Sequence, residues 1–137
     1  MLDAGQHFNR SESACTGYVA PRELRHAVDI RRNAESRMTR SDDHGMLRTW
    51  EPIKGDNGYL GCAVVMVDPA SVAEAPDTTS AYLVVARVPD GRPAVYYAGS
   101  AWNKAGVITS VAAWDHSIDN VARRVRTPLE VAIEPAR

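Results

Sequence analysis

The chain has few cysteines, no long apolar run and no excess of either charge. Cys15 and Cys62 are its only cysteines in 137 residues, too few for a disulfide framework. The longest apolar runs, residues 63–67 and 81–86, fall far short of the roughly 20 residues that cross a membrane. Sixteen basic against seventeen acidic residues give a net charge of -1, which favours neither a nucleic-acid partner nor a membrane partner.

Several familiar catalytic and cofactor motifs are also missing. The sequence contains no phosphate-binding glycine loop, no Gly-x-Ser-x-Gly elbow and no His-Glu-x-x-His pair. Asp42, Asp43 and His44 form the densest group of metal-ligating residue types. Three neighbouring side chains in a loop rarely converge on one ion, and no fourth ligand is suitably spaced. We therefore expect no metal site and no cofactor.

The first residues do not have the pattern of an export signal. Residues 1–7 contain neither a basic stretch nor an apolar core, so the chain as written is predicted to be cytoplasmic. Hydrophobic residues at 45% and charged residues at 24% are typical of a globular protein. A length of 137 residues is compatible with a single domain over residues 1–137.

The hydrophobic pattern predicts a mainly β fold. Residues 60–68 and 80–88 are valine-rich runs that are apolar on both faces, as in strands covered on both sides. Residues 94–98 form a further strand, whereas residues 31–45 hold so many charged and small polar residues that we expect a surface loop. The order of these runs and turns predicts an antiparallel β-sandwich.

One helix follows these strands. Apolar residues recur at intervals of three and four over residues 110–126, with Ser110 or Thr109 as the N-cap and Pro128 just beyond the end. After it, alternation over residues 129–133 predicts a half-buried strand. The expected fold is therefore a mainly β sandwich with one C-terminal α-helix.

Two aromatic clusters beside polar residues are the strongest functional candidates. Aromatic faces suit the C–H face of a sugar, while carboxylate, amide and ammonium groups hydrogen-bond its hydroxyls. We therefore expect a carbohydrate ligand. Taken singly, the tryptophans have a simpler interpretation, which is that they close the core where the strands meet the helix. The candidate binding residues are Trp50, Tyr97, Trp102, Asn103 and Lys104.

Glu51 is the candidate catalytic residue. It stands beside an aromatic residue at the end of an expected strand, a position from which a carboxyl group can act as acid or base. Glycoside hydrolysis normally needs two carboxylates. Asp56 and Asp115 are the candidates for a second carboxylate. Their spacing in the sequence does not show that either lies near Glu51.

Several short motifs follow one another along the chain. They are Leu2-Asp3-Ala4-Gly5, Trp50-Glu51-Pro52, Asp56-Asn57-Gly58, Tyr97-x-Gly99-x-x-Trp102-x-Lys104 and Pro128-Leu129. In this order they resemble the C-terminal part of the bacterial domain-of-unknown-function family 4861, whose members are considerably longer. The resemblance implies that residues 1–137 are the C-terminal portion of a larger β-sandwich of the galactose-mutarotase-like kind.

The same resemblance implies a function. Family members are typically exported by bacteria that degrade plant or algal polysaccharides, which implies periplasmic or secreted full-length relatives. It therefore implies a carbohydrate-active protein of the hydrolase, lyase or epimerase type that acts on acidic polysaccharides. A sugar-binding sandwich without turnover and an inactive structural fragment are the alternatives. Because a truncated sandwich has unpaired sheet edges, we also expect self-association through them.

Overall fold

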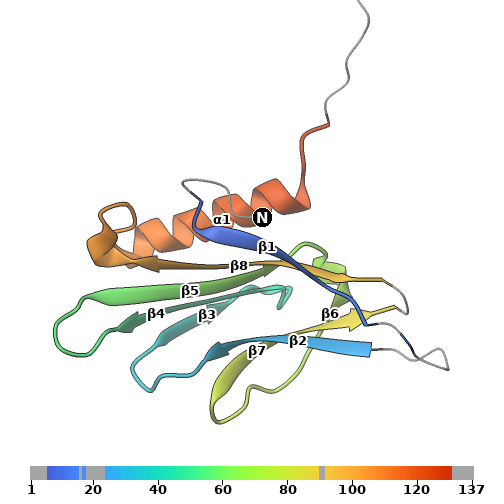
Figure 1. Ribbon diagram of the computed structural model, residues 1–137, viewed down its shortest axis with the longest axis horizontal. Helices are drawn as coiled ribbons and strands as arrows, with labels where there is room; N and C mark the ends of the chain where they lie inside the picture. Colours follow the sequence, from blue (N-terminus) through green and yellow to red (C-terminus); the bar gives the residue numbers. More distant parts are fainter. Residues whose placement is uncertain (1–5, 16, 18–23, 90–91, 131–137) are drawn as a thin grey trace, which may run out of the picture.

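The computed structural model describes residues 6–15, 17, 24–89 and 92–130. Within these residues the chain forms two antiparallel sheets and one long helix (Figure 1). The larger sheet has five strands in the order β1-β8-β5-β4-β3, and the smaller has three in the order β2-β7-β6. The mainly β sandwich with a C-terminal helix confirms the predicted fold class.

Each element is defined by its residue range. The larger sheet consists of β1 (Phe8–Ser13), β8 (Ala94–Trp102), β5 (Tyr59–Met66), β4 (Met46–Pro52) and β3 (Arg37–Arg40). The smaller sheet consists of β2 (Leu24–Arg31), β7 (Ala81–Val88) and β6 (Val72–Ala73). The remaining elements are two 3-10 turns, η1 (Pro69–Ser71) and η2 (Asn103–Ala105), and the helix α1 (Val111–Arg126).

Strand β5 is buried on both faces, as its valine-rich sequence predicts. Val64 and Met66 point toward the smaller sheet and join a core that includes Val84 of β7. Ala63 and Val65 alternate with them and point to the opposite face, into a second core beneath α1. Three layers therefore stack in the order smaller sheet, larger sheet, helix.

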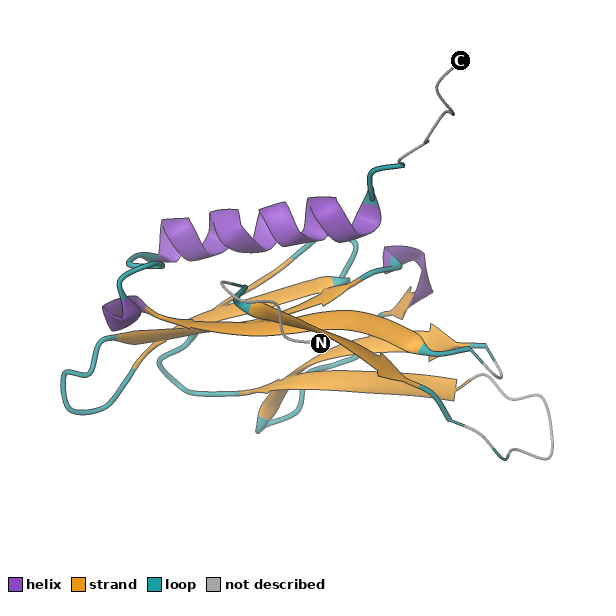
Figure 2. Cartoon of the chain, turned by 45° about the horizontal axis from the view of Figure 1, so that its top comes forward, coloured by secondary structure: helices purple, strands orange, loops and turns teal. Residues whose placement is uncertain are grey.

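Helix α1 lies along the outer face of the larger sheet (Figure 2). Its start is as predicted, because the Oγ of Ser110 accepts a hydrogen bond from the N–H of Ala113. Arg48 of β4 fixes the helix laterally by pairing with Asp115 and Asp119. The apolar stripe that α1 buries consists of Trp114, Ile118, Val121 and Ala122.

Two local expectations differ from the structure. The surface loop expected over residues 31–45 is wrong in part, because β3 occupies Arg37–Arg40 and pairs with β4. A strand with one apolar residue, Met38, has too weak a pattern to detect, yet Met38 packs against the core between the sheets. Of the strand expected over residues 129–133, Leu129 and Glu130 are exposed and not in a strand, and residues 131–133 lie outside the described residues.

No described helix is both long enough and apolar enough to span a membrane. The cysteines Cys15 and Cys62 are both free thiols.

Candidate functional site

Glu51 and Trp102 lie in one row on the same face of the larger sheet. Glu51 pairs with Leu60 of β5, and Leu60 pairs with Trp102 of β8. Residues directly opposite one another share a face, and neighbouring strands lie about 4.8 Å apart. The Cα atoms of Glu51 and Trp102 are therefore separated by two strand spacings, about 10 Å, and Leu60 stands between them on the same face.

A second row on the same face adds three polar side chains. Thr49 of β4 pairs with Cys62 of β5, and Cys62 pairs with Ser100 of β8. This end of β5 and β8, near η2, projects beyond the smaller sheet (Figure 1). We call the two rows the open-end strip, which consists of Thr49, Glu51, Leu60, Cys62, Ser100 and Trp102.

Exposure rises across the open-end strip from β4 to β8. Thr49 is 1% exposed and Trp102 is 44% exposed, with Glu51 half-buried. Glu51 Oε2 and Thr49 Oγ1 are buried and have no hydrogen-bond partner among the described residues. Leaving a buried acceptor unpaired costs about 1–3 kcal/mol.

Cys62 is a poor nucleophile in this setting. Burial raises the pKa of its thiol, and the negative charge of Glu51 raises it further. Because the thiolate is the reactive form, the thiol stays protonated at neutral pH.

The polar atoms of three predicted site residues hold the turn between β4 and β5. Trp102 Nε1 donates to Asn57 O over 2.7 Å, Asn103 Oδ1 accepts from Tyr59 N over 2.7 Å, and Lys104 Nζ donates to Asp56 O over 2.5 Å. The indole N–H of Trp102 is thus used, while its ring keeps an exposed face. Lys104 has two further N–H donors, since an ammonium carries three.

Trp50 and Tyr97 lie on the other face of the sheet, toward α1. Trp50 pairs with Gly61, one residue out of step with Glu51, and its ring stacks on Tyr59 with centroids 5.9 Å apart. Tyr97 packs against the core beneath the helix. The structure therefore places Glu51, Trp102, Asn103 and Lys104 at one end of the larger sheet, whereas Trp50 and Tyr97 lie on its opposite face.

The two other carboxylates considered with Glu51 do not belong to the open-end strip. Asp115 is on α1 and pairs with Arg48 over 3.1 Å, on the helix side of the larger sheet. Asp56 lies in the turn with a positive φ of 57°. Glu51 is thus the single carboxylate of the strip.

Asp43, in the group of possible metal ligands, has a structural role. It accepts hydrogen bonds from Ser41 Oγ and Gly45 N, and it pairs with Arg126 of α1 over 2.9 Å. Burial by itself raises its pKa, but these contacts outweigh burial and lower the pKa below 3.8. No group of three or more metal-ligating residues was found within the part of the chain that the structure describes.

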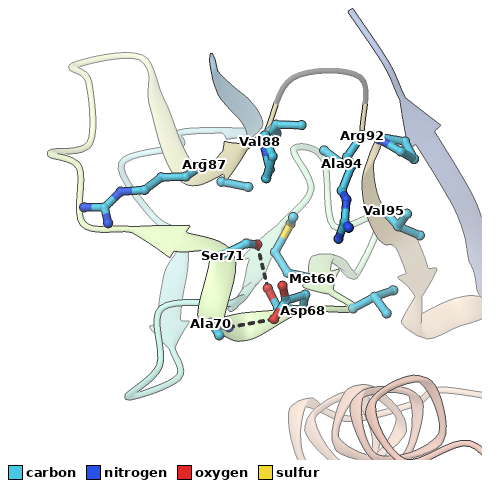
Figure 3. A pocket seen from close by; sticks show the side chains of 13 residues that line it. Met66, Asp68, Ala70, Ser71, Arg87, Val88, Arg92, Ala94 and Val95 are labelled. Atoms are coloured by element: carbon cyan, nitrogen blue, oxygen red, sulfur yellow. Dashed lines mark hydrogen bonds between the residues drawn. The ribbon is translucent and has the colours of Figure 1, made fainter. Parts of the chain in front are cut away.

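A pocket of about 380 Å³ opens between the sheets at the opposite end of β5 and β8 (Figure 3). Met66, Val88 and Ala94 contribute apolar atoms, and Arg92 contributes a guanidinium. The carboxylate that lines the pocket belongs to Asp68, and it already accepts a hydrogen bond from Ala70 N as the N-cap of η1. None of the residues singled out from the sequence lines this pocket.

Thr49, Cys62 and Ser100 were not among the predicted site residues. Strand periodicity could have found two of them, because Thr49 and Ser100 stand two residues before Glu51 and Trp102 and so share their face. Finding Cys62 required the register between β4, β5 and β8, which the sequence alone does not give.

Comparison with known proteins gives the class of this two-sheet sandwich. The family model for the domain of unknown function DUF4861 matches residues 1–131, so the chain belongs to that family, and the predicted family is confirmed. Uncharacterized protein P7 of Formosa agariphila is 30% identical over 137 residues. That match covers 97% of this chain but 33% of the relative, so the chain spans about a third of the relative's length. No solved structure matches the chain.

Proposed function

We propose that the chain is part of a carbohydrate-active protein and that the open-end strip binds an acidic sugar unit. The observation that carries the proposal is the row Glu51–Leu60–Trp102, in which an exposed tryptophan ring faces the same side as a carboxylate with a buried, unpaired oxygen. An aromatic platform and a hydrogen-bond acceptor are the two elements that a site needs to bind a sugar ring.

Each group has a distinct role in this proposal. The Trp102 ring supports the C–H face of the sugar, and the carboxylate of half-buried Glu51 accepts a hydrogen bond from a sugar hydroxyl. Lys104 stands two residues beyond Trp102, where the remaining donors of its ammonium neutralise a sugar carboxylate. That neutralisation offsets the repulsion between an acidic sugar and Glu51.

The reaction that best fits one carboxylate and one ammonium is proton abstraction next to a carboxylate. Glu51 would take the proton from the carbon that bears the sugar carboxylate, while Lys104 stabilises the negative charge that develops there. In a lyase, the electron pair then forms a C=C bond and expels the glycosidic oxygen on the next carbon, which takes up the proton that Glu51 removed. An epimerase would need a second acid, from outside the strip, to donate a proton to the opposite face. Hydrolysis by paired carboxylates would need a second acid from outside the strip.

Binding is tested with matched acidic and neutral oligosaccharides. Calorimetric titration should show that galacturonate oligomers bind the full chain and that neutral galactose oligomers bind at least tenfold more weakly. Trp102→Phe keeps an aromatic face and should retain binding, whereas Trp102→Leu should lose it. Both variants lose the hydrogen bond from the Trp102 indole to Asn57 O. A difference in affinity between them therefore reports the aromatic face and not the loss of this bond in the turn. Trp50→Phe, on the opposite face, is the control and should bind normally.

Turnover is tested separately. A lyase releases unsaturated products that absorb in the ultraviolet, and Glu51→Gln should abolish their formation without abolishing binding. Equal turnover in the wild type and Glu51→Gln would eliminate Glu51 as the acid or base. Binding without turnover in the wild type would favour the alternative function, a sugar-binding sandwich. If neither oligosaccharide binds, the proposal is wrong.

A further inference from the structure

Strand β2 forms an edge of the smaller sheet. It pairs with β7 on one side, and within the described residues no strand pairs with its other side. Arg32 N donates to Ser80 O across this pairing. Because hydrogen-bonded pairs alternate along an antiparallel ladder, the even-numbered residues of β2 bond toward β7. The backbone groups of Ala27 and Asp29 therefore point outward, to the open edge.

The side chains of β2 are divided between the two faces of the smaller sheet. Leu24, Val28 and Ile30 pack against the core between the sheets. The alternate residues are exposed, and they include both signs of charge. An edge strand of eight residues without proline is long enough for strand addition, and its exposed charges restrict the registers in which a partner strand can pair.

We propose that β2 of a second copy of this chain pairs antiparallel with β2, about a two-fold axis through Ala27. In this register Arg25 of one copy lies opposite Asp29 of the other, and the symmetry repeats the pair. Opposite charges directly across two strands stabilise their pairing. At the axis, Ala27 faces its own copy in a hydrogen-bonded pair, in which each Ala27 N–H donates to the C=O of the other copy.

Neighbouring registers lack this charge complementarity. An axis at Val28 would place Arg25 opposite Arg31, and an axis at Asp29 would place that carboxylate opposite itself. An axis at His26 would break the Arg25–Asp29 pair. Like charges directly opposite each other destabilise a strand pair. An axis between two residues would turn the buried face of one copy toward solvent.

The chosen register also continues the buried face across the junction. Leu24 of one copy lies opposite Ile30 of the other, and His26 lies opposite Val28, all on the side that faces the larger sheet. The two three-stranded sheets would form one six-stranded sheet, in which the outward N–H and C=O groups of β2 are paired. This inference is independent of sugar binding and concerns a different surface.

Sedimentation velocity of the full 137-residue chain tests the dimer, and charge reversal tests its register. Arg25→Asp or Asp29→Arg places like charges opposite each other twice and should raise the dimer dissociation constant about ten- to a hundredfold. The double variant, Arg25→Asp with Asp29→Arg, exchanges the charges and should restore the dimer. Arg25 also has contacts within its own chain, so circular dichroism must show that each variant is folded.

Cross-linking gives a second, geometric readout. In a chain carrying Cys15→Ser and Cys62→Ala, a short thiol cross-linker should join two copies through Ala27→Cys. It should not join them through Arg31→Cys, because in this register those positions lie about 27 Å apart.

Three results would overturn the proposal: a wild type that stays monomeric at all concentrations, a dimer that tolerates the single charge reversals, and a dimer that links through position 31 instead of 27. A dimer with the predicted charge response and cross-link would establish it.

Discussion

The indole of Trp114 lies directly against the backbone of Gly61. A Cβ atom at position 61 would stand 2.5 Å from Trp114 Nε1 and 2.7 Å from Cε2. Trp114 is fully buried, and Phe8 stacks on it with ring centroids 5.5 Å apart. The missing side chain of one strand residue therefore creates the space in which the main aromatic residue of α1 packs.

Gly61→Ala should consequently destabilise the protein. Neither the strand nor the buried indole can move freely, so we expect the overpacking to cost about 1–3 kcal/mol in the free energy of unfolding. Denaturant unfolding measures it. Combining Gly61→Ala with Trp114→Phe should cost less than the sum of the two single changes, because the smaller ring relieves the contact. Strict additivity would show that Trp114 does not limit this position.

Asn103 should matter through its acceptor oxygen. Gly58 has a positive φ of 84° and adjoins the Asn103 side chain, whose Oδ1 accepts from Tyr59 N. Asn103→Ala removes that acceptor and should lower stability by about 1 kcal/mol, with faster hydrogen exchange at the Tyr59 amide. Asn103→Asp keeps an oxygen in place and is the matched control. Unchanged exchange in Asn103→Ala would refute the role assigned to this bond.

The contacts of Asp43 should make stability depend on pH in the acid range. Although burial opposes it, hydrogen bonds and Arg126 lower the pKa of Asp43 in the folded protein below its unfolded value of 3.8. A depressed pKa contributes stability that is present above pH 3.8 and is lost as the pH falls through the folded pKa. Unfolding of Asp43→Asn should show a weaker acid dependence than the wild type, whereas Asp42→Asn, at the exposed neighbour, should not differ. Identical acid profiles for all three proteins would contradict the prediction.

Cys62 should resist alkylation until the pH is well above that needed for an ordinary thiol. Burial and the charge of Glu51 raise its pKa above 9.0, and alkylation requires the thiolate. In a Cys15→Ser background, the rate of iodoacetamide labelling against pH reports Cys62 alone. Glu51→Gln removes the nearby charge and should shift this profile to lower pH, while Glu51→Asp should not. If the labelling profile of Glu51→Gln is the same as that of the Cys15→Ser background, the Glu51 charge does not affect the pKa of Cys62.

The local pattern of the sequence predicted several elements correctly, because each depends mainly on near neighbours. The cap at Ser110 and the stripe from Trp114 to Ala122 define α1 with contacts three and four residues apart. The apolar runs of β5 and β7 likewise indicated strands covered on both sides. The short strand β3 was missed because its burial comes from a partner strand and not from its own composition.

The candidate site was only partly predictable. Glu51, Trp102, Asn103 and Lys104 were chosen as aromatic and polar neighbours along the chain, and they do lie at one end of the larger sheet. Trp50 was chosen for the same reason but belongs to the opposite face. Successive strand residues alternate between faces, and nothing in a cluster of adjacent residues shows which of them will face the ligand.

The sequence by itself determined the types and the order of the elements, since helix periodicity, capping and apolar runs are local properties of the chain. Only the tertiary structure decided that Glu51 and Trp102 share a row and that Thr49 and Cys62 lie beside them. It also decided that, among the residues the structure describes, no strand pairs with the outer side of β2. The physical reason is register: which residues stand opposite each other depends on how distant strands pair and on the turns that align them.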